Sequence, residues 1–105
     1  MIGVRVQIVR FVDPHQPGFV ECELVDANGH VWTFIEKVPV VSLADLDADS
    51  LYPTAGFVAC KVVKRLANGS GQQRVRISTA EPWHVEAAGG ETEFEVRPDQ
   101  LIDDV

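Results

Sequence analysis

Apolar and polar residues alternate along most of this chain, and this alternation constrains the fold more than any other feature. Val4, Val6 and Ile8 alternate with polar residues near the start, and the segments 20–24 and 92–96 repeat the pattern. Successive side chains of a strand point to opposite faces of a sheet, so a period of two indicates strands with one solvated face. The sequence therefore predicts an all-β protein.

Residues that tolerate positive φ separate the predicted strands, at Asn28-Gly29, Asn68-Gly69 and Gly89-Gly90. Tight hairpin turns need such residues. We therefore expect three hairpins, which pair 18–25 with 30–36, 56–66 with 72–79, and 83–87 with 91–97.

Six to seven antiparallel strands in 105 residues favour a meander that curls into a small, partly open β-barrel, with a β-sandwich as the alternative. The chain length suits one domain that spans residues 1–105. Bulky side chains are expected to fill the barrel interior. They are Trp32, Phe34, Phe57, Val62, Trp83 and Phe94.

The net charge of −7 opposes general affinity for nucleic acid or anionic membranes and favours a basic protein partner. Polar residues interrupt the first ten positions, and no apolar run approaches membrane-spanning length. We expect a cytoplasmic protein, a monomer or a small homo-oligomer, with Cys22 and Cys60 as reduced thiols. No Cys-x-x-Cys motif is present, and we expect no cofactor.

Positive charge is concentrated in the middle of the chain, because no acid occurs between residues 51 and 80. The favoured interpretation is that Arg74 and Arg76 face Glu93 and Glu95 in cross-strand ion pairs that fix the register. The alternative is single-stranded nucleic-acid binding by the 57–79 hairpin. Its basic face would consist of Lys61, Arg65, Arg74 and Arg76. This hairpin has only Phe57, at its far end, as an aromatic platform for base stacking.

Asp45, Asp47 and Asp49 match the first three ligand positions of a calcium-binding loop of the EF-hand type. The required glycine and closing glutamate are replaced by serine and glycine, so we expect no metal site. Ser42 followed by Asp45 instead resembles a capping box, which predicts a short helical turn near 43–48.

No arrangement of residues identifies a catalytic site. His15, His30 and His84 are widely spaced, and both cysteines fall on predicted inward faces, where burial raises a thiol pKa. His84 and Glu86 are expected to form a surface pair. No nucleophile motif or triad spacing is present, so the chain is not expected to be an enzyme.

A candidate binding cleft is expected between the strand end at Glu36 and Lys37 and the segment that contains Trp83 and His84. Tyr52 lies in the loop that adjoins this strand end. Binding sites on β scaffolds usually occur where strands meet loops. These five residues are therefore the predicted binding set.

The stretches FIEKVPVV at 34–41, DSLYPTAGFVAC at 49–60 and RISTAEPW at 76–83 resemble small uncharacterised bacterial single-domain proteins of about this length. No activity is attached to that group, so the resemblance implies a bacterial soluble protein and no mechanism. Our leading hypothesis is a non-enzymatic binding module for a macromolecular partner, of which an inhibitor or immunity-type protein is one form. A barrel that binds a small molecule or catalyses a simple reaction is the alternative.

Overall fold

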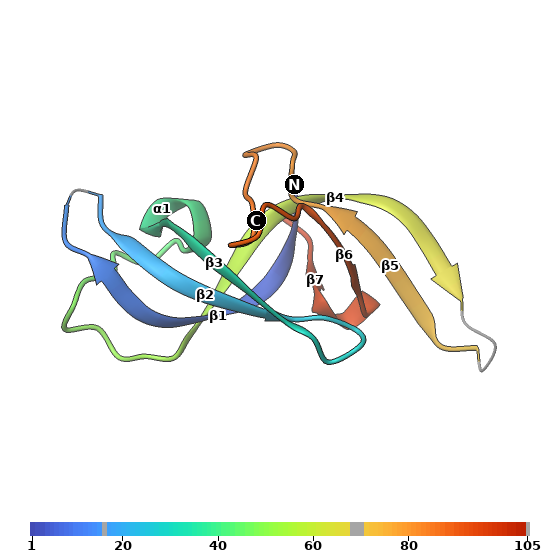
Figure 1. The fold of residues 1–105 in the computed structure, drawn as a ribbon, viewed down its shortest axis with the longest axis horizontal. Coiled ribbons are helices and arrows are strands. Elements are labelled where there is room, and N and C mark those ends of the chain that lie inside the picture. The colour runs from blue at the N-terminus through green and yellow to red at the C-terminus, as the bar shows by residue number, and fades with distance from the viewer. Residues whose placement is uncertain (16, 68–70, 105) are drawn as a thin grey trace.

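The computed structural model describes residues 1–15, 17–67 and 71–104 and shows an all-β protein (Figure 1). Its elements are β1 (Ile2–Asp13), β2 (Phe19–Val25), β3 (Val31–Lys37), α1 (Val38–Val41), β4 (Thr54–Ala67), β5 (Gln73–Ser78), β6 (Glu93–Val96), the 3-10 helix η1 (Pro98–Gln100) and β7 (Leu101–Ile102). No helix among the described residues is long and apolar enough to cross a membrane.

The strands form one curled antiparallel sheet in the order β3-β2-β1-β4-β5-β6, with β7 added beside β1. The predicted partly open barrel is confirmed as a half-barrel. β4 pairs with β1 along its first half and with β5 along its second half. As a result the β4–β5 hairpin extends away from the rest of the sheet (Figure 1).

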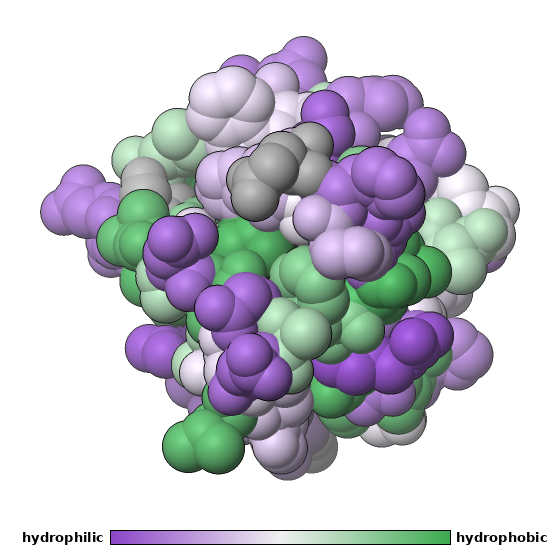
Figure 2. All heavy atoms as spheres, turned by 90° about the vertical axis from the view of Figure 1, so that its left-hand side faces the viewer, coloured by the Kyte–Doolittle hydropathy of each residue, from purple (hydrophilic) through white to green (hydrophobic). Residues whose placement is uncertain are grey.

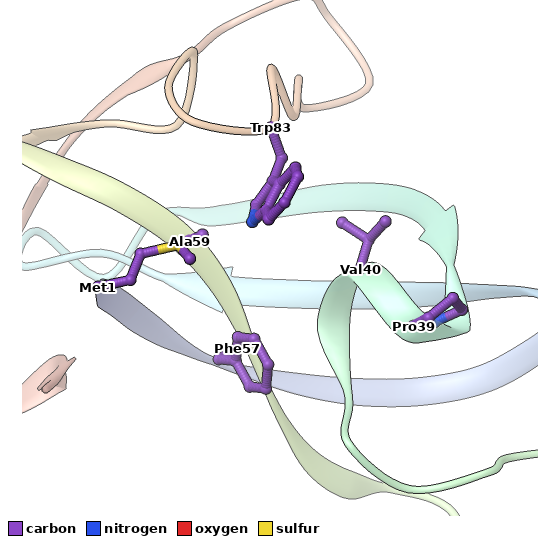
Figure 3. A pocket seen from close by; sticks show the side chains of 6 residues that line it. All are labelled: Met1, Pro39, Val40, Phe57, Ala59 and Trp83. Atoms are coloured by element: carbon purple, nitrogen blue, oxygen red, sulfur yellow. The ribbon is translucent and has the colours of Figure 1, made fainter. Parts of the chain in front are cut away.

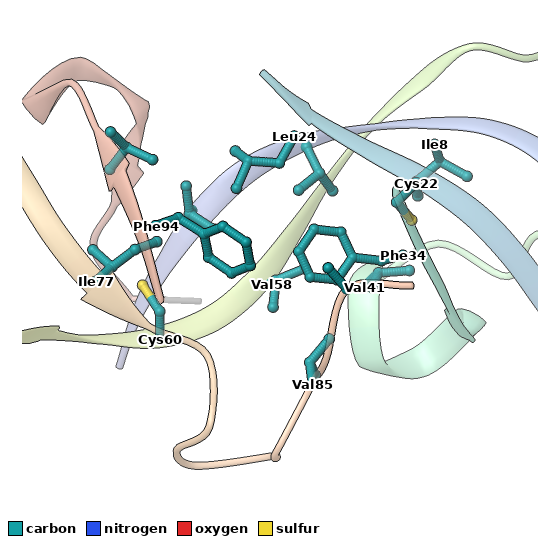
Figure 4. Close-up of a cluster of buried hydrophobic side chains, with 14 of the residues drawn as sticks. Ile8, Cys22, Leu24, Phe34, Val41, Val58, Cys60, Ile77, Val85 and Phe94 are labelled. Atoms are coloured by element: carbon teal, nitrogen blue, oxygen red, sulfur yellow. The ribbon is translucent and has the colours of Figure 1, made fainter. Parts of the chain in front are cut away.

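The alternating apolar residues fill the concave side of this sheet (Figure 4). Val4, Val6 and Ile8 are all buried, as the pattern predicted. Phe34 and Phe94 are the large aromatic residues of the core, and their rings meet edge to face with centroids 5.6 Å apart. The predicted interior position of Trp83 is wrong, because its side chain is 58% exposed.

The first two predicted hairpins are confirmed as β2–β3 and β4–β5. The tip of the second, at 68–70, lies outside the described residues. The third is wrong, because 83–87 is not a strand and β6 pairs with β5 instead. His84 takes a φ of 52°, which breaks the extended conformation. The seventh strand is β7, which the sequence pattern did not indicate.

The predicted helical turn near 43–48 is also wrong, because the helix α1 ends at Val41 and Ser42 is extended. The Ser42 hydroxyl accepts a hydrogen bond from the Ala44 N–H, and Asp47 accepts one from the Asp49 N–H. Such local side-chain bonds compete with helix formation.

Candidate functional site

An apolar groove of about 290 Å³ lies between α1, β4 and the loop that joins β5 to β6 (Figure 3). Its lining residues are Met1, Pro39, Val40, Phe57, Ala59 and Trp83. The Trp83 side chain reaches from the loop toward β4 and α1, and it is 58% exposed. A large exposed indole over an apolar floor is the feature that most resembles a recognition site.

β4 supplies the floor of the groove through alternate residues. Phe57 and Ala59 point to the face opposite the buried Val58 and Cys60. α1 supplies the facing wall because it begins directly after β3, with Pro39 in its first turn.

The loop that carries Trp83 is fastened to the core by Thr79 and Val85, which are both fully buried. The Thr79 hydroxyl donates to the Val85 carbonyl at 2.6 Å, and the Val85 N–H donates to the Thr79 carbonyl at 2.9 Å. These reciprocal bonds hold the segment between them as a closed loop. Trp83 is therefore presented from an anchored loop.

Of the five residues in the predicted binding set, only Trp83 lines the groove. The Tyr52 hydroxyl donates to the Asp47 carbonyl at 2.7 Å, within its own loop. The Glu36 carboxylate accepts from the Lys37 N–H. The predicted position of the cleft is close to the groove nevertheless, since the wall formed by α1 starts immediately after Lys37.

His84 and Glu86 form the predicted surface pair, with Nε2 and Oε1 2.9 Å apart and both side chains exposed. This pair lies outside the residues that line the groove. The wall and floor residues Pro39, Val40, Phe57 and Ala59 were not predicted as site residues. Phe57 was assigned to the interior, although an aromatic residue out of phase with the buried positions was a signal for a surface role.

The two cysteines are buried in the core rather than placed at the groove. Burial raises the pKa of Cys22 to about 12, with smaller contributions from Glu36 and Glu21. Burial also raises the pKa of Cys60 to about 11. Both thiols are therefore protonated at neutral pH and poorly suited to nucleophilic attack.

The acidic loop does not gather its carboxylates into a ligand set. Across the described ranges, no group of three or more histidine, cysteine or acidic side chains is placed to hold a metal ion. Asp47 bonds to the main chain of Asp49 and to the Ser50 hydroxyl. These contacts stabilise the turn itself.

The basic residues of the β4–β5 hairpin lie on two faces. Lys64 lies opposite Arg76, and both are on one face of the hairpin. Arg65 lies opposite the buried Val75 and is therefore on the other face. Lys61 forms an ion pair with Glu81 at 2.8 Å.

The register of β5 and β6 aligns one of the two predicted charge pairs, but no ion pair joins these two strands among the described residues. Arg76 lies directly opposite Glu95, as expected. Arg74 instead donates a hydrogen bond to the Asn28 side chain, and Glu93 lies opposite Ser78. Nucleic-acid binding by this hairpin remains a prediction that the register does not favour.

Comparison of the chain with protein-family models, with curated proteins and with solved structures found no match. The groove beneath Trp83 is accordingly interpreted from its own geometry.

Proposed function

We propose that this protein is a non-enzymatic binding module that recognises a partner protein through the groove beneath Trp83. The observation that carries the proposal is an indole that remains 58% exposed above an apolar floor. If a partner covered roughly 100 Å² of this ring, the burial would contribute about 2.5 kcal/mol to binding. Tryptophan residues in apolar pockets are frequent hot spots of protein interfaces.

The lining of the groove supports binding rather than turnover. None of its six side chains is titratable or nucleophilic, and the two thiols are buried elsewhere with raised pKa values. General acid–base catalysis needs a positioned group that exchanges protons near the operating pH. The groove offers apolar contact area and shape instead.

The charge of the chain supports a basic partner. The net charge is −7, and the loop that carries Trp83 contains Glu81, Glu86 and Glu91 but no lysine or arginine. Complementary charge speeds the encounter of two proteins and disfavours wrong partners. An inhibitor or immunity-type role against a basic protein is one concrete form of this function.

The test is capture of a partner by the immobilised protein from a native lysate at low and at high salt. Trp83→Ala should reduce the amount of captured partner at least tenfold. Ile35→Ala is the matched control, because it removes another exposed apolar side chain, 51% exposed and on β3. Failure to capture any protein at low salt, or equal capture by Trp83→Ala, would contradict the proposal.

A further inference from the structure

One edge of β4 lies along the groove without a neighbouring strand. β4 pairs with β1 from Thr54 to Cys60, and its pairing with β5 begins only at Lys61. Within the described part of the chain, no strand pairs with β4 on the other side along 54–60. Phe57 and Ala59, which form the groove floor, belong to this stretch.

The direction of the main-chain groups follows from the register. Residues of an antiparallel strand alternate between those that bond to one neighbour and those that bond to the other. The Thr79 N–H donates to the Thr92 carbonyl at 2.7 Å, across the continuation of the β5–β6 ladder. The N–H and C=O of the preceding residue, Ser78, therefore point to β4.

Ser78 lies opposite Lys61, so the N–H and C=O of Lys61 point to β5. The same alternation along β4 points the main-chain groups of Ala59 and Phe57 to this side, away from β1. The same alternation can be followed through the register from β4 across β1 and β2 to β3. There it directs the Thr33 carbonyl away from β2, toward the outer edge of the sheet. That carbonyl does accept a hydrogen bond from the Ala88 N–H, at 2.8 Å, which supports the assignment.

On this side of β4, no hydrogen bond joins the main chain of Phe57 or Ala59 to another described residue. Phe57 is half-buried, whereas Ala59 is only 1% exposed, so a partner reaches the Ala59 main chain only by displacing the side chains that cover it. Buried main-chain groups are nearly always paired in folded proteins, because leaving them unpaired costs free energy. The groove floor therefore holds donors and acceptors that need a partner as well as apolar side chains.

We infer that the partner binds as an extended segment that adds to β4 along 57–59. This inference rests on the proposed function and specifies how the same groove is used. Phe57 and Ala59 offer two N–H and two C=O groups in the spacing of an exposed strand edge, which is the pattern that strand addition uses. Alternate side chains of the segment pack against Trp83 and Val40.

The two ends of this edge set the length of the paired segment. At one end α1 approaches so closely that a Cβ on Gly56 would lie 2.8 Å from the Val41 carbonyl oxygen. At the other end β5 begins opposite Lys61. Three or four residues of an extended segment fit between these ends, because a strand advances about 3.3 Å per residue.

The charge around the groove selects a basic segment over a second copy of this chain. The Trp83 loop contains three glutamates and no lysine or arginine, although an ion pair with Lys61 offsets the charge of Glu81. Two copies of the chain would each bring a net charge of −7. Like net charges repel, whereas a segment with lysine or arginine beside the apolar residues is attracted.

The test starts from a library of displayed nine-residue peptides, selected on the wild-type protein and counter-selected on Trp83→Ala. The most enriched peptide is measured by calorimetry together with a series in which each main-chain N–H is methylated in turn. We expect lysine or arginine to be enriched. Methylation at alternate positions should weaken binding at least tenfold, and methylation at the intervening positions less than threefold.

Amide hydrogen exchange provides the second readout. On saturation with the peptide, the N–H groups of Phe57 and Ala59 should become at least tenfold more protected. Those of Val58 and Cys60, which point to β1, should change little. Ile35→Ala should bind the peptide like the wild type.

The outcomes separate the two proposals. A Trp83-dependent peptide that tolerates methylation at every position overturns strand addition and leaves the proposed function in place. Absence of any Trp83-dependent peptide overturns both. A dimer that protects Phe57 and Ala59 at micromolar concentration identifies a second copy as the occupant and overturns the basic partner.

Discussion

The carboxylate of Asp26 holds the turn between β2 and β3, and its removal should destabilise the protein. Asp26 is only 6% exposed. Its Oδ1 accepts hydrogen bonds from the N–H groups of Asn28 at 2.8 Å and His30 at 2.9 Å. Its Oδ2 accepts one from the Trp32 indole N–H at 2.9 Å. Three donors, two from the turn and one from Trp32 in β3, thus converge on a single buried side chain.

We expect Asp26→Ala to lower the free energy of unfolding by about 3 kcal/mol. Each lost hydrogen bond contributes about 1 kcal/mol, and the indole N–H of Trp32, half-buried, is left without its acceptor. In a domain of this size the melting temperature should fall by roughly 12 °C or more.

Urea unfolding followed by circular dichroism measures this change. Asp45→Ala is the matched control, because Asp45 is an exposed carboxylate, and it should change the free energy of unfolding by about 0.5 kcal/mol or less. A loss below about 1 kcal/mol for Asp26→Ala would refute the assignment of Asp26 as the residue that holds this turn.

The same carboxylate should also contribute to the loss of unfolding free energy as the pH is lowered. Burial alone raises the pKa of Asp26, but hydrogen bonds from Trp32, His30 and Asn28 outweigh it and hold the pKa below its usual 3.8. Its stabilisation is therefore complete above the unfolded pKa and is lost as pH falls through the lower folded pKa. Asp26→Asn should weaken the dependence of the free energy of unfolding on pH in this acidic range. An unchanged dependence would contradict the reasoning.

Three further predictions concern the core, the thiols and the acidic loop. Gly56→Ala should cost about 1–3 kcal/mol in urea unfolding, because its Cβ would lie 2.7 Å from Ile8 Cδ1; an unchanged midpoint would argue against this close packing. At pH 8 a thiol reagent should react far more slowly with the native protein than with the unfolded protein. The reason is that burial raises the pKa of Cys22 to about 12 and the pKa of Cys60 to about 11. Equal reaction rates would contradict this. Millimolar calcium or magnesium should leave the amide chemical shifts of residues 45–49 unchanged. The reason is that the turn glycine and the closing glutamate of a calcium-binding loop are absent. Saturable changes of these chemical shifts would show a metal site.

The sequence alone predicted the strands whose two faces differ most in environment. Val4, Val6 and Ile8 face the core and their neighbours face solvent, so the pattern is visible in the residues themselves. The Asn28-Gly29 turn was equally readable, because Gly29 takes a φ of 80° that side chains disfavour. These signals are local, since each depends on a few consecutive residues.

The candidate site was predicted only in part for the opposite reason. Trp83 was assigned to the interior because alternation was extended through 83–87, where the chain is not a strand. The exposure of Trp83 follows from the positive φ of His84 and from the anchoring of its loop at Thr79. Neither the backbone angle of His84 nor the hydrogen bond at Thr79 can be recognised from the adjacent sequence.

By itself, then, the sequence determined the all-β class, the buried face of the main strands and two of the three hairpins. Only the tertiary structure decided that α1 and the Trp83 loop meet over β4, and that no strand of the described residues pairs with Phe57 and Ala59 on the side away from β1. The physical reason is that side-chain periodicity reports which face of a strand is buried. Which strand edges are paired depends instead on contacts between segments distant along the chain.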